Sequence, residues 1–216
     1  SFLGCHSISP YLDFKIETGD SLISPNVKSI QPDIFFESMI KEYEVVKSKY
    51  QIAKKKETKI KLINKIKEIK NNISNKYGNK KNTFEWMVEF AEVFYSSSTK
   101  SGFDIILANP PYGLKVSNEI KKNFVKNIKI SSDSYGFFLL RAFQLLSHGG
   151  ILSFIISDTW RTLSTFEYIR EKIYGYEIKH IIDLPSWIFD ATVNTNILSI
   201  SKNEDNTSYP IAEFSN

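Results

Sequence analysis

Six mostly apolar residues, Phe103–Ala108, lead directly into the tetrapeptide Asn109-Pro110-Pro111-Tyr112. A short apolar run of this kind is typical of a strand that is buried on both faces of a parallel sheet. In open α/β sheets, ligands bind just beyond the carboxyl ends of the strands, which is where this tetrapeptide begins. The sequence therefore predicts an α/β fold with a functional site at residues 109–112.

The chain around this run alternates between strand-like and helix-like patterns. Residues 134–146 have helical spacing, and further strands are expected at residues 151–156, 178–184 and 196–201. Asp158 or Thr159 is expected to cap a helix that runs to about Tyr174. This order of elements is typical of a doubly wound, mostly parallel, Rossmann-like sheet, of which the chain would form part.

One more strand is expected near the start of the chain. Residues 12–17 alternate between apolar and polar side chains, and the segment Thr18-Gly19-Asp20-Ser21 follows as a turn. An acidic residue, Asp20, therefore lies at the carboxyl end of this expected strand.

Between these patterns lies a lysine-rich region. Residues 41–81 contain 14 lysines and four acidic residues, a net charge of +10 in a chain whose total charge is +4, so the rest of the chain carries −6. Apolar residues step by three and four along residues 39–53 and again along residues 62–73, out of phase across Lys54-Lys55-Lys56. We expect two helices of about 20 residues packed as a hairpin, the alternative being one continuous helix with a stutter.

Charge and composition limit the kind of partner. A +10 segment beside an acidic body indicates a polyanion, the alternative being an ordinary solvated lysine-rich surface. The apolar runs are far shorter than the roughly 18 residues of a membrane span, so no membrane partner is expected. The N-terminal residues lack a secretory pattern, and the single Cys5 cannot form an internal disulfide, so the cytoplasm is the expected location.

The tetrapeptide has a defined hydrogen-bonding chemistry. Two successive prolines stiffen the loop and remove two backbone donors. With the side-chain oxygen of Asn109, the loop offers two acceptors, which suits an exocyclic NH₂ group with two hydrogens. Tyr112 offers an aromatic face on which a planar base can stack. A Pro-Pro turn with an ordinary polar cap is the alternative.

Residues 103–112 resemble the fourth conserved motif of methyltransferases that transfer a methyl group from S-adenosylmethionine (AdoMet) to an amino group. Further segments narrow the resemblance to adenine-N6 DNA methyltransferases of type IIG and related restriction–modification enzymes. The acidic and aromatic segment 84–94 precedes the motif, and Asp133-Ser134-Tyr135, residues 149–155 and residues 181–192 follow it in family order. The resemblance covers roughly residues 10–200, and the lysine-rich hairpin resembles an insertion that these proteins often carry.

The resemblance implies roles for the tetrapeptide. Asn109 and the carbonyl oxygen of Pro110 would accept the two hydrogens of adenine N6 and aim its lone pair at the methyl group, with Asn109 also beside the cofactor. Pro111 belongs to the same catalytic loop. The adenine would be flipped out of double-stranded DNA and held against Tyr112. The implied reaction requires no metal.

Other residues receive roles by the same resemblance. Asp20 matches the acid that accepts a hydrogen bond from the adenine amine of AdoMet, although such an acid is often only a turn residue. Phe189 and Trp187 are candidate walls for the flipped base, with packing in the core as the more common role of such residues. From the charge of the hairpin, and not from the resemblance, Lys54-Lys55-Lys56 are its expected DNA contacts.

The sequence departs from the family in its cofactor half. It has neither the glycine-rich AdoMet loop nor the acid for the ribose hydroxyls. We therefore expect a partial methyltransferase domain, with residues 1–32 as its start, 33–80 as the hairpin insertion and 81–216 as the catalytic part. Such a piece is expected to be inactive alone and to self-associate. Target recognition, and any nuclease, would lie in other domains of the whole protein.

Three other interpretations stay open at this level. The same tetrapeptide occurs in methyltransferases that act on release-factor glutamine or on RNA guanine. Asp104, Glu119 and Lys121 fit a loose nuclease metal pattern, although Asp104 lies within the apolar run. A DNA-binding or assembly module without enzymatic activity is the third interpretation.

Overall fold

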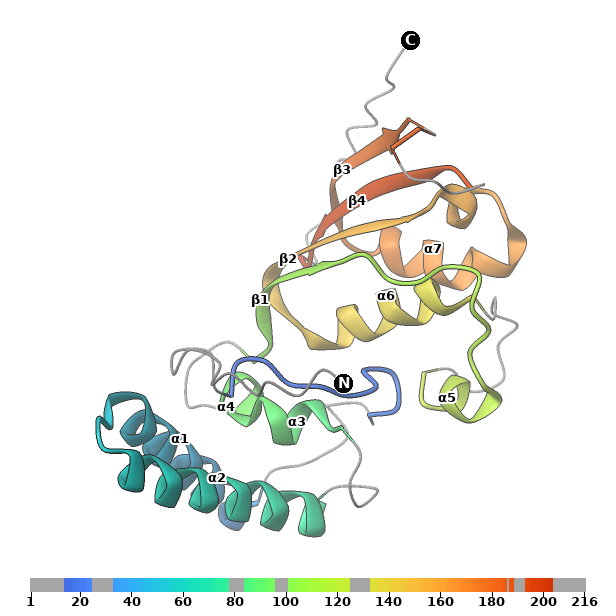
Figure 1. Ribbon diagram of the computed structural model, residues 1–216. Helices are drawn as coiled ribbons and strands as arrows, with labels where there is room; N and C mark the ends of the chain where they lie inside the picture. The colour runs from blue at the N-terminus through green and yellow to red at the C-terminus, as the bar shows by residue number, and fades with distance from the viewer. Residues whose placement is uncertain are drawn as a thin grey trace, which may run out of the picture. The chain divides into compact units, whose positions relative to one another are not determined.

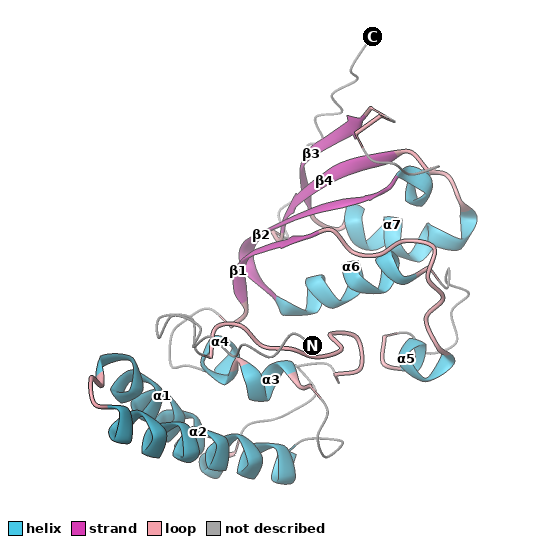
Figure 2. Ribbon diagram, in the orientation of Figure 1, coloured by secondary structure: helices cyan, strands magenta, loops and turns pink. Residues whose placement is uncertain are grey.

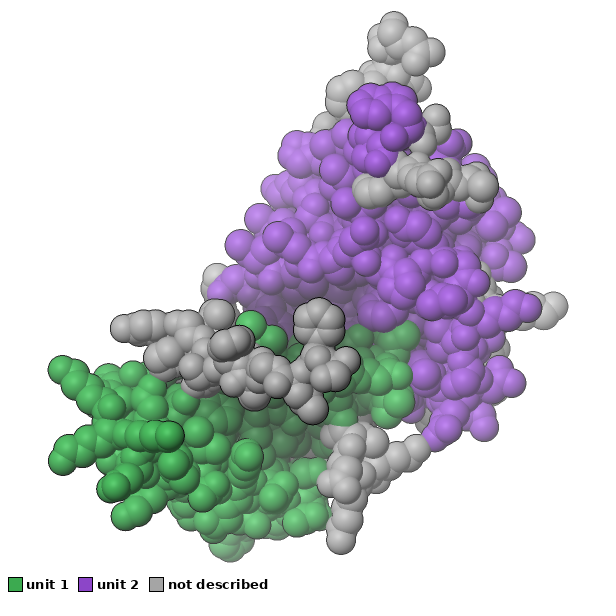
Figure 3. Space-filling view, viewed as in Figure 1, with its two compact units in different colours: residues 1–98 green, residues 99–216 purple. Residues whose placement is uncertain are grey.

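The computed structural model describes residues 14–24, 33–77, 84–95, 101–124, 133–185, 187–188 and 193–203 of the 216-residue chain. The chain divides into two compact units, residues 1–98 and residues 99–216 (Figure 3). Across the described ranges, no helix combines the length and the apolar character that crossing a membrane requires.

Unit 1 is built on the lysine-rich hairpin. Helix α1 spans Ile34–Ile52 and helix α2 spans Lys56–Tyr77, and the two lie side by side (Figure 1). The Asp33 side chain caps α1 by accepting a hydrogen bond from the Phe36 amide at 2.7 Å. The two-helix hairpin expected from the sequence is confirmed, and the continuous helix is excluded.

The apolar stripes predicted along both helices form the core of the hairpin. Its buried side chains come at helical spacing: Phe36, Ile40, Tyr43, Val46 and Tyr50 from α1, and Ile66, Ile69 and Ile73 from α2. Burial of each such aliphatic side chain contributes about 1.5–3 kcal/mol to folding. These packed apolar side chains therefore hold the two helices of the hairpin together. The lysines lie on the outer surface or pair with acidic residues.

Two short helices pack with the hairpin in the same unit. Helix α3 spans Trp86–Glu89 and helix α4 spans Ala91–Tyr95. The Trp86 indole N–H donates to the carbonyl oxygen of Ser21 at 3.0 Å, which ties α3 to residues 14–24. The acidic and aromatic segment noted in the sequence is thus part of the core of unit 1.

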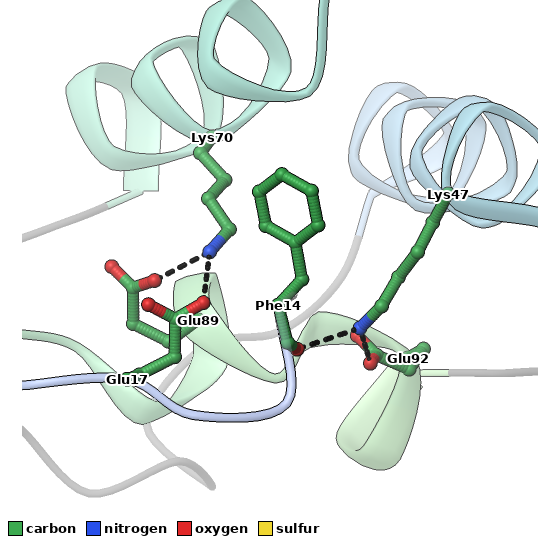
Figure 4. Close-up of polar contacts among 6 residues, drawn as sticks. All are labelled: Phe14, Glu17, Lys47, Lys70, Glu89 and Glu92. Carbon is green, nitrogen blue, oxygen red and sulfur yellow. Dashed lines mark hydrogen bonds and ion pairs between the residues drawn. The ribbon is translucent and has the colours of Figure 1, made fainter. Parts of the chain in front are cut away.

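Two lysines of the hairpin form an internal clamp on these neighbouring segments. Lys47 of α1 pairs with Glu92 and donates to the carbonyl oxygen of Phe14 at 3.2 Å (Figure 4). Lys70 of α2 pairs with Glu17 at 2.8 Å and with Glu89 at 2.5 Å (Figure 4). We call Lys47, Lys70 and these four partners the lysine clamp.

The clamp surrounds a buried tyrosine. Tyr43 is fully buried, and the Lys47 ammonium lies over its ring, 5.4 Å from the ring centre. Burial, followed by the charges of Glu92, Glu17 and Glu89, raises the pKa of the Tyr43 phenol far above its ordinary value. Tyr43 therefore stays protonated at neutral pH.

The strand expected at residues 12–17 is not formed over its described part. Residues 14–17 form a turn and a bend, and residues 12–13 lie outside the described residues. Phe14 has a φ of +62°, which a strand does not permit. Its carbonyl oxygen is bound by Lys47, and Glu17 is bound by Lys70, so side chains of the hairpin fix this segment.

Unit 2 contains a four-stranded sheet. Its strands are β1 (Phe103–Ala108), β2 (Leu146–Ser157), β3 (Glu177–Leu184) and β4 (Thr195–Ser201), in the order β1-β2-β4-β3 (Figure 2). β1 and β2 are parallel, and β4 is antiparallel to both β2 and β3. Three strands therefore share one direction, as expected for a mostly parallel α/β sheet, and only β4 is reversed.

Helices connect the strands that share a direction. Helix α6 (Ser134–Leu145) lies between β1 and β2 in the chain, and α7 (Glu167–Tyr174) lies between β2 and β3. Both pack on one face of the sheet (Figure 2), whose buried side chains are Leu152, Phe154 and Ile156 of β2 and Leu198 and Ile200 of β4. Gly136 lets α6 approach α7, because a Cβ there would lie 2.5 Å from Ile169 Cδ1.

Two details of unit 2 differ from the sequence-based expectations. β1 is not buried on both faces: Ile105 and Leu107 are 64% and 72% exposed, and they lie on the face opposite Leu152 and the helices α6 and α7. The helix expected from residue 158 is replaced at first by 3₁₀ turns at residues 158–161 and 164–166. Arg170 binds the carbonyl oxygens of Trp160 and Leu163, and Ser157 supplies the cap in place of Asp158 or Thr159.

Candidate functional site

The tetrapeptide leaves β1 at the edge where the parallel strand β2 also ends. Pro110 is buried, Tyr112 is half-buried, and Asn109 and Pro111 are exposed. The loop is therefore anchored through one proline and presents the side chain of Asn109 to the outside. This is the position at which open α/β sheets bind their ligands.

The N-terminus of α6 holds this loop. Asp133 caps α6, and its two carboxylate oxygens accept from the Gly113 amide at 3.1 and 3.2 Å. Ser134 Oγ donates to the carbonyl oxygen of Pro111 at 2.6 Å, and the Ser134 amide donates to the Leu114 carbonyl oxygen at 2.9 Å. Two adjacent residues of the helix thus fix both ends of the segment from Pro111 to Leu114.

These bonds distinguish the two loop carbonyls. The carbonyl oxygen of Pro111 is occupied by Ser134. The carbonyl oxygen of Pro110 receives no hydrogen bond from any residue that the structure describes. Together with Asn109 Oδ1, it leaves the loop with two acceptors for an outside donor.

Tyr112 is placed against Asn109. The Tyr112 hydroxyl lies 3.3 Å from Asn109 Oδ1, a long hydrogen bond in which the phenol is the donor. Because Asn109 Oδ1 has two lone pairs, it can accept a second hydrogen while it keeps this contact.

A chain of hydroxyl groups ties the start of α6 to the end of β2. The Tyr135 hydroxyl lies 2.9 Å from Thr159 Oγ1, which lies 3.0 Å from Ser157 Oγ. Burial, the largest effect, raises the pKa of the Tyr135 phenol far above its ordinary value, so it stays protonated and able to donate. Tyr135 also stacks on Phe166, with ring centres 4.9 Å apart.

Asp133 and Ser134 are the functional residues that sequence reasoning missed. The segment Asp133-Ser134-Tyr135 was recognised as the start of a helix, and its contacts with the loop were not inferred. An aspartate at an N-cap was the available signal, because its carboxylate can bind amides outside the helix as well as within it. Helix α5 (Asn118–Lys122) lies between the two segments in the chain.

The other predicted site residues lie apart from this loop in the chain. Asp20, in unit 1, is exposed, and one of its oxygens accepts from the Leu22 amide at 2.9 Å as in an ordinary Asx turn. Lys54, Lys55 and Lys56 are exposed at the junction of α1 and α2.

The candidate walls of the base pocket follow β3 in the chain. Phe189 lies outside the described residues. Trp187 is 81% exposed, so it is not packed in the core of the described part of the chain.

The carboxylate of Asp20 can accept a hydrogen bond from an amine. Its second carboxylate oxygen accepts no hydrogen bond within the described residues, and the side chain faces solvent. It can therefore accept a second hydrogen bond in addition to the one within its turn.

Comparison with known proteins gives the family. The model of the Eco57I restriction-modification methylase family matches residues 22–189. A Methanocaldococcus jannaschii protein named as a type II restriction enzyme and methyltransferase is 27% identical over 118 residues, which cover 54% of this chain and 10% of the relative. The type II methyltransferase M.TthHB8I of Thermus thermophilus is 35% identical over 80 residues, which cover 32% of this chain and 19% of the relative.

A solved structure from Listeria monocytogenes, described as a class I S-adenosylmethionine-dependent methyltransferase, is 23% identical to this chain. The TM-score is 0.44, over 50% of this chain and 34% of that one. The chain spans less than a fifth of the length of each of the two curated relatives. Since the family match covers more than half of its residues, the chain belongs to the Eco57I restriction-modification methylase family.

Proposed function

We propose that the protein transfers a methyl group from AdoMet to N6 of adenine in DNA, as part of a restriction–modification enzyme. The observation that carries this proposal is the pair of acceptors on the loop, Asn109 Oδ1 and the Pro110 carbonyl oxygen, with the neighbouring Pro111 carbonyl already occupied by Ser134. Membership of the methylase family supports it, as do the names of the two curated relatives.

Adenine N6 is a weak nucleophile because its lone pair is delocalised into the ring. Asn109 and Pro110 would each bind one of its hydrogens, which favours a tetrahedral nitrogen with a localised lone pair. Neither oxygen is a strong base, so both orient the amino group and leave its proton to be lost to water after transfer. The rigid prolines and the bonds from Ser134 and Asp133 keep the acceptors in place without reorganisation.

The base must leave the duplex to reach this loop, at a cost of a few kcal/mol. Tyr112 would offset part of this cost by stacking, which is worth about 1–3 kcal/mol per base. AdoMet, when bound, supplies an electrophilic methyl group on a positively charged sulfur, and Asp20 would hold its adenine amine. A DNA substrate also agrees with the cytoplasmic location expected from the single cysteine.

The remaining functions of such a system would lie outside this chain. Because the chain spans only part of its relatives, we assign target recognition, and any DNA cleavage, to other parts of the whole protein. A chain of this extent is expected to have little activity alone.

The test is a methylation assay on the full-length protein with labelled AdoMet. Double-stranded DNA, tRNA and release factor are offered separately, and the product is digested to identify the methylated atom. N6-methyladenine in DNA, lost in the Asn109→Ala variant, is the expected result. Methylated glutamine or guanine would instead assign the loop to one of the other two amino substrates. No methyl transfer to any of the three would refute the proposal.

A further inference from the structure

Most lysines of the hairpin fall into two groups according to their partners, whereas Lys41 and Lys67 are exposed on the helices and have no acidic partner among the described residues. One group lies along the paired helices, and each member binds an acid: Lys47 with Glu92, Lys65 with Glu42 and Glu68, Lys70 with Glu17 and Glu89, and Lys76 with Asp33. The positive charge of this group is used within unit 1.

The two more exposed members of this group, Lys65 and Lys76, also have acidic partners. Hydrogen bonds to Glu68 and then Glu42 raise the pKa of Lys65. The hydrogen bond to Tyr77, and then the charge of Asp33, raise the pKa of Lys76. These four lysines hold structure together, and a polyanion would have to compete with their acids.

The second group lies where the two helices meet, and we call residues 49–61 the hairpin tip. The tip contains six lysines and one acidic residue, a net charge of +5 over 13 residues: Lys49, Lys54, Lys55, Lys56, Lys59, Lys61 and Glu57. None of these lysines forms an ion pair with an acid of the described chain. Five are exposed, and Lys59 lies over the Tyr50 ring, 5.0 Å from its centre.

We propose that the hairpin tip binds the phosphate backbone of DNA. The inference rests on the proposed function, which supplies DNA as the partner, and it assigns the contact to the tip in place of the whole basic region. Two packed helices of 19 and 22 residues form a rigid arm about 30 Å long, and the six lysines of the tip gather at one end of it. Lysine ammonium groups on flexible stems suit phosphates, which carry no sequence information.

The chemistry of the tip favours a duplex backbone over other anionic partners. Tyr50 is buried, so the tip offers no exposed aromatic ring for stacking on unpaired bases. Ile52 and Ile60 are exposed, and two isoleucines without an exposed aromatic residue form a poor anchor for a lipid surface. The tip is therefore expected to strengthen DNA binding equally for all sequences.

The test compares two variants of the full-length protein that lose the same charge. Lys54→Gln/Lys55→Gln removes two lysines of the tip, both in the turn between the helices. Lys41→Gln/Lys67→Gln removes two exposed lysines that also lack an acidic partner and lie on the helices outside the tip. Glutamine and lysine have similar helix propensities, so the control does not disturb α1 or α2.

DNA affinity is measured by fluorescence anisotropy on a duplex without the target site, across a range of salt concentrations. The tip variant should lose roughly eightfold in affinity per phosphate contact at 0.1 M salt, and the salt slope should fall by about 0.9 per contact. The control variant should stay within twofold of the wild type. Equal losses in both variants, or no loss in either, would overturn the assignment to the tip.

Two further measurements separate this inference from the proposed function. The first is the methylation assay: a wild type that binds DNA through the tip but methylates nothing would refute only the proposed function. The second measurement tests the binding of the protein to vesicles that contain phosphatidylserine. Binding to these vesicles through Lys54 and Lys55, with no tip-dependent binding to DNA, would assign the tip to a membrane surface and overturn the inference.

Discussion

Ser134 Oγ donates a hydrogen bond of 2.6 Å to the carbonyl oxygen of Pro111, which joins the first residue of α6 to the loop that follows β1. This bond occupies the carbonyl next to the one that we assign to the substrate. Helix and loop are separated by more than 20 residues in the chain, so the acceptors of the loop are positioned by tertiary structure. The same contact makes Ser134 a positioning residue for the proposed reaction.

Ser134→Ala should therefore lower kcat more than it raises KM for DNA. A displacement of the loop acceptors by about 1 Å costs up to about 100-fold in rate, and the lost hydrogen bond costs about 0.5–1.5 kcal/mol of stability. Ser147→Ala is a matched control, because Ser147 is also buried in unit 2 and its hydroxyl binds Asp104. Equal kcat values in the two variants would show that Ser134 does not position the loop for the reaction.

Asn109→Ala removes one of the two proposed acceptors. By analogy with the loss of one oxyanion-hole donor, it should cost about 2.7–4 kcal/mol of transition-state stabilisation. Asn109 is exposed, so the melting temperature should hardly change. Asn118→Ala, at an exposed residue of α5, is the control. Calorimetry should find nearly normal AdoMet affinity in the Asn109 variant, and wild-type methylation rates would contradict the assignment.

Tyr112 has two separable features, its ring and its hydroxyl. Loss of stacking in Tyr112→Ala should cost about 1–3 kcal/mol, whereas Tyr112→Phe keeps the ring and should be mild. The hydroxyl lies 3.3 Å from Asn109 Oδ1, so a Phe variant as slow as the Ala variant would show that this contact orients the amide. Single-turnover methylation rates of the two variants distinguish the two roles.

The lysine clamp leads to a prediction about stability. Lys47→Met leaves Glu92 without its partner in a partly buried position, and the loss of one member of a buried ion pair costs about 3–5 kcal/mol, less where the partner keeps contact with water. Adding Glu92→Gln should restore much of this loss, because it removes the uncompensated charge. Urea unfolding of the three proteins gives the comparison. A double variant less stable than Lys47→Met would mean that the two side chains act separately.

Local patterns in the sequence were sufficient for much of the fold. Apolar runs and helical periodicity predicted β3, β4, α6 and both helices of the hairpin, because each pattern reflects one buried face of one element. The tetrapeptide marked the loop for a similar reason, since the stiffness of two prolines is a local property.

The features that were missed depend on contacts between distant segments. Residues 14–17 have a strand-like alternation, yet Lys47 and Lys70 bind this segment from 30 or more positions away, and Phe14 adopts a positive φ. The exposure of Ile105 depends on which elements cover its face of the sheet. No periodicity encodes such relationships, and the same limit hid the bond between Ser134 and Pro111.

The last prediction concerns the outer edge of β1. Within the described sheet, β1 has a neighbouring strand on one side only, and Ile105 and Leu107 on one of its faces are largely exposed. β1 contains no lysine or proline, and an outer strand without these residues at its open edge is a template for pairing with another chain. We therefore expect the 216-residue chain to self-associate, which a charge on this face should oppose.

Light scattering over a range of concentrations checks this expectation. Leu107→Lys should shift the chain toward monomer, whereas Leu163→Lys, at an exposed leucine outside the sheet, should not. Because the sequence has neither the glycine-rich AdoMet loop nor the acid for the ribose hydroxyls, we also expect weak AdoMet binding. Titration calorimetry on the same sample measures this affinity. A chain that stays monomeric at all concentrations and binds AdoMet with micromolar affinity would contradict both parts, because a complete pocket requires neighbours on both sides of the cofactor-binding strands.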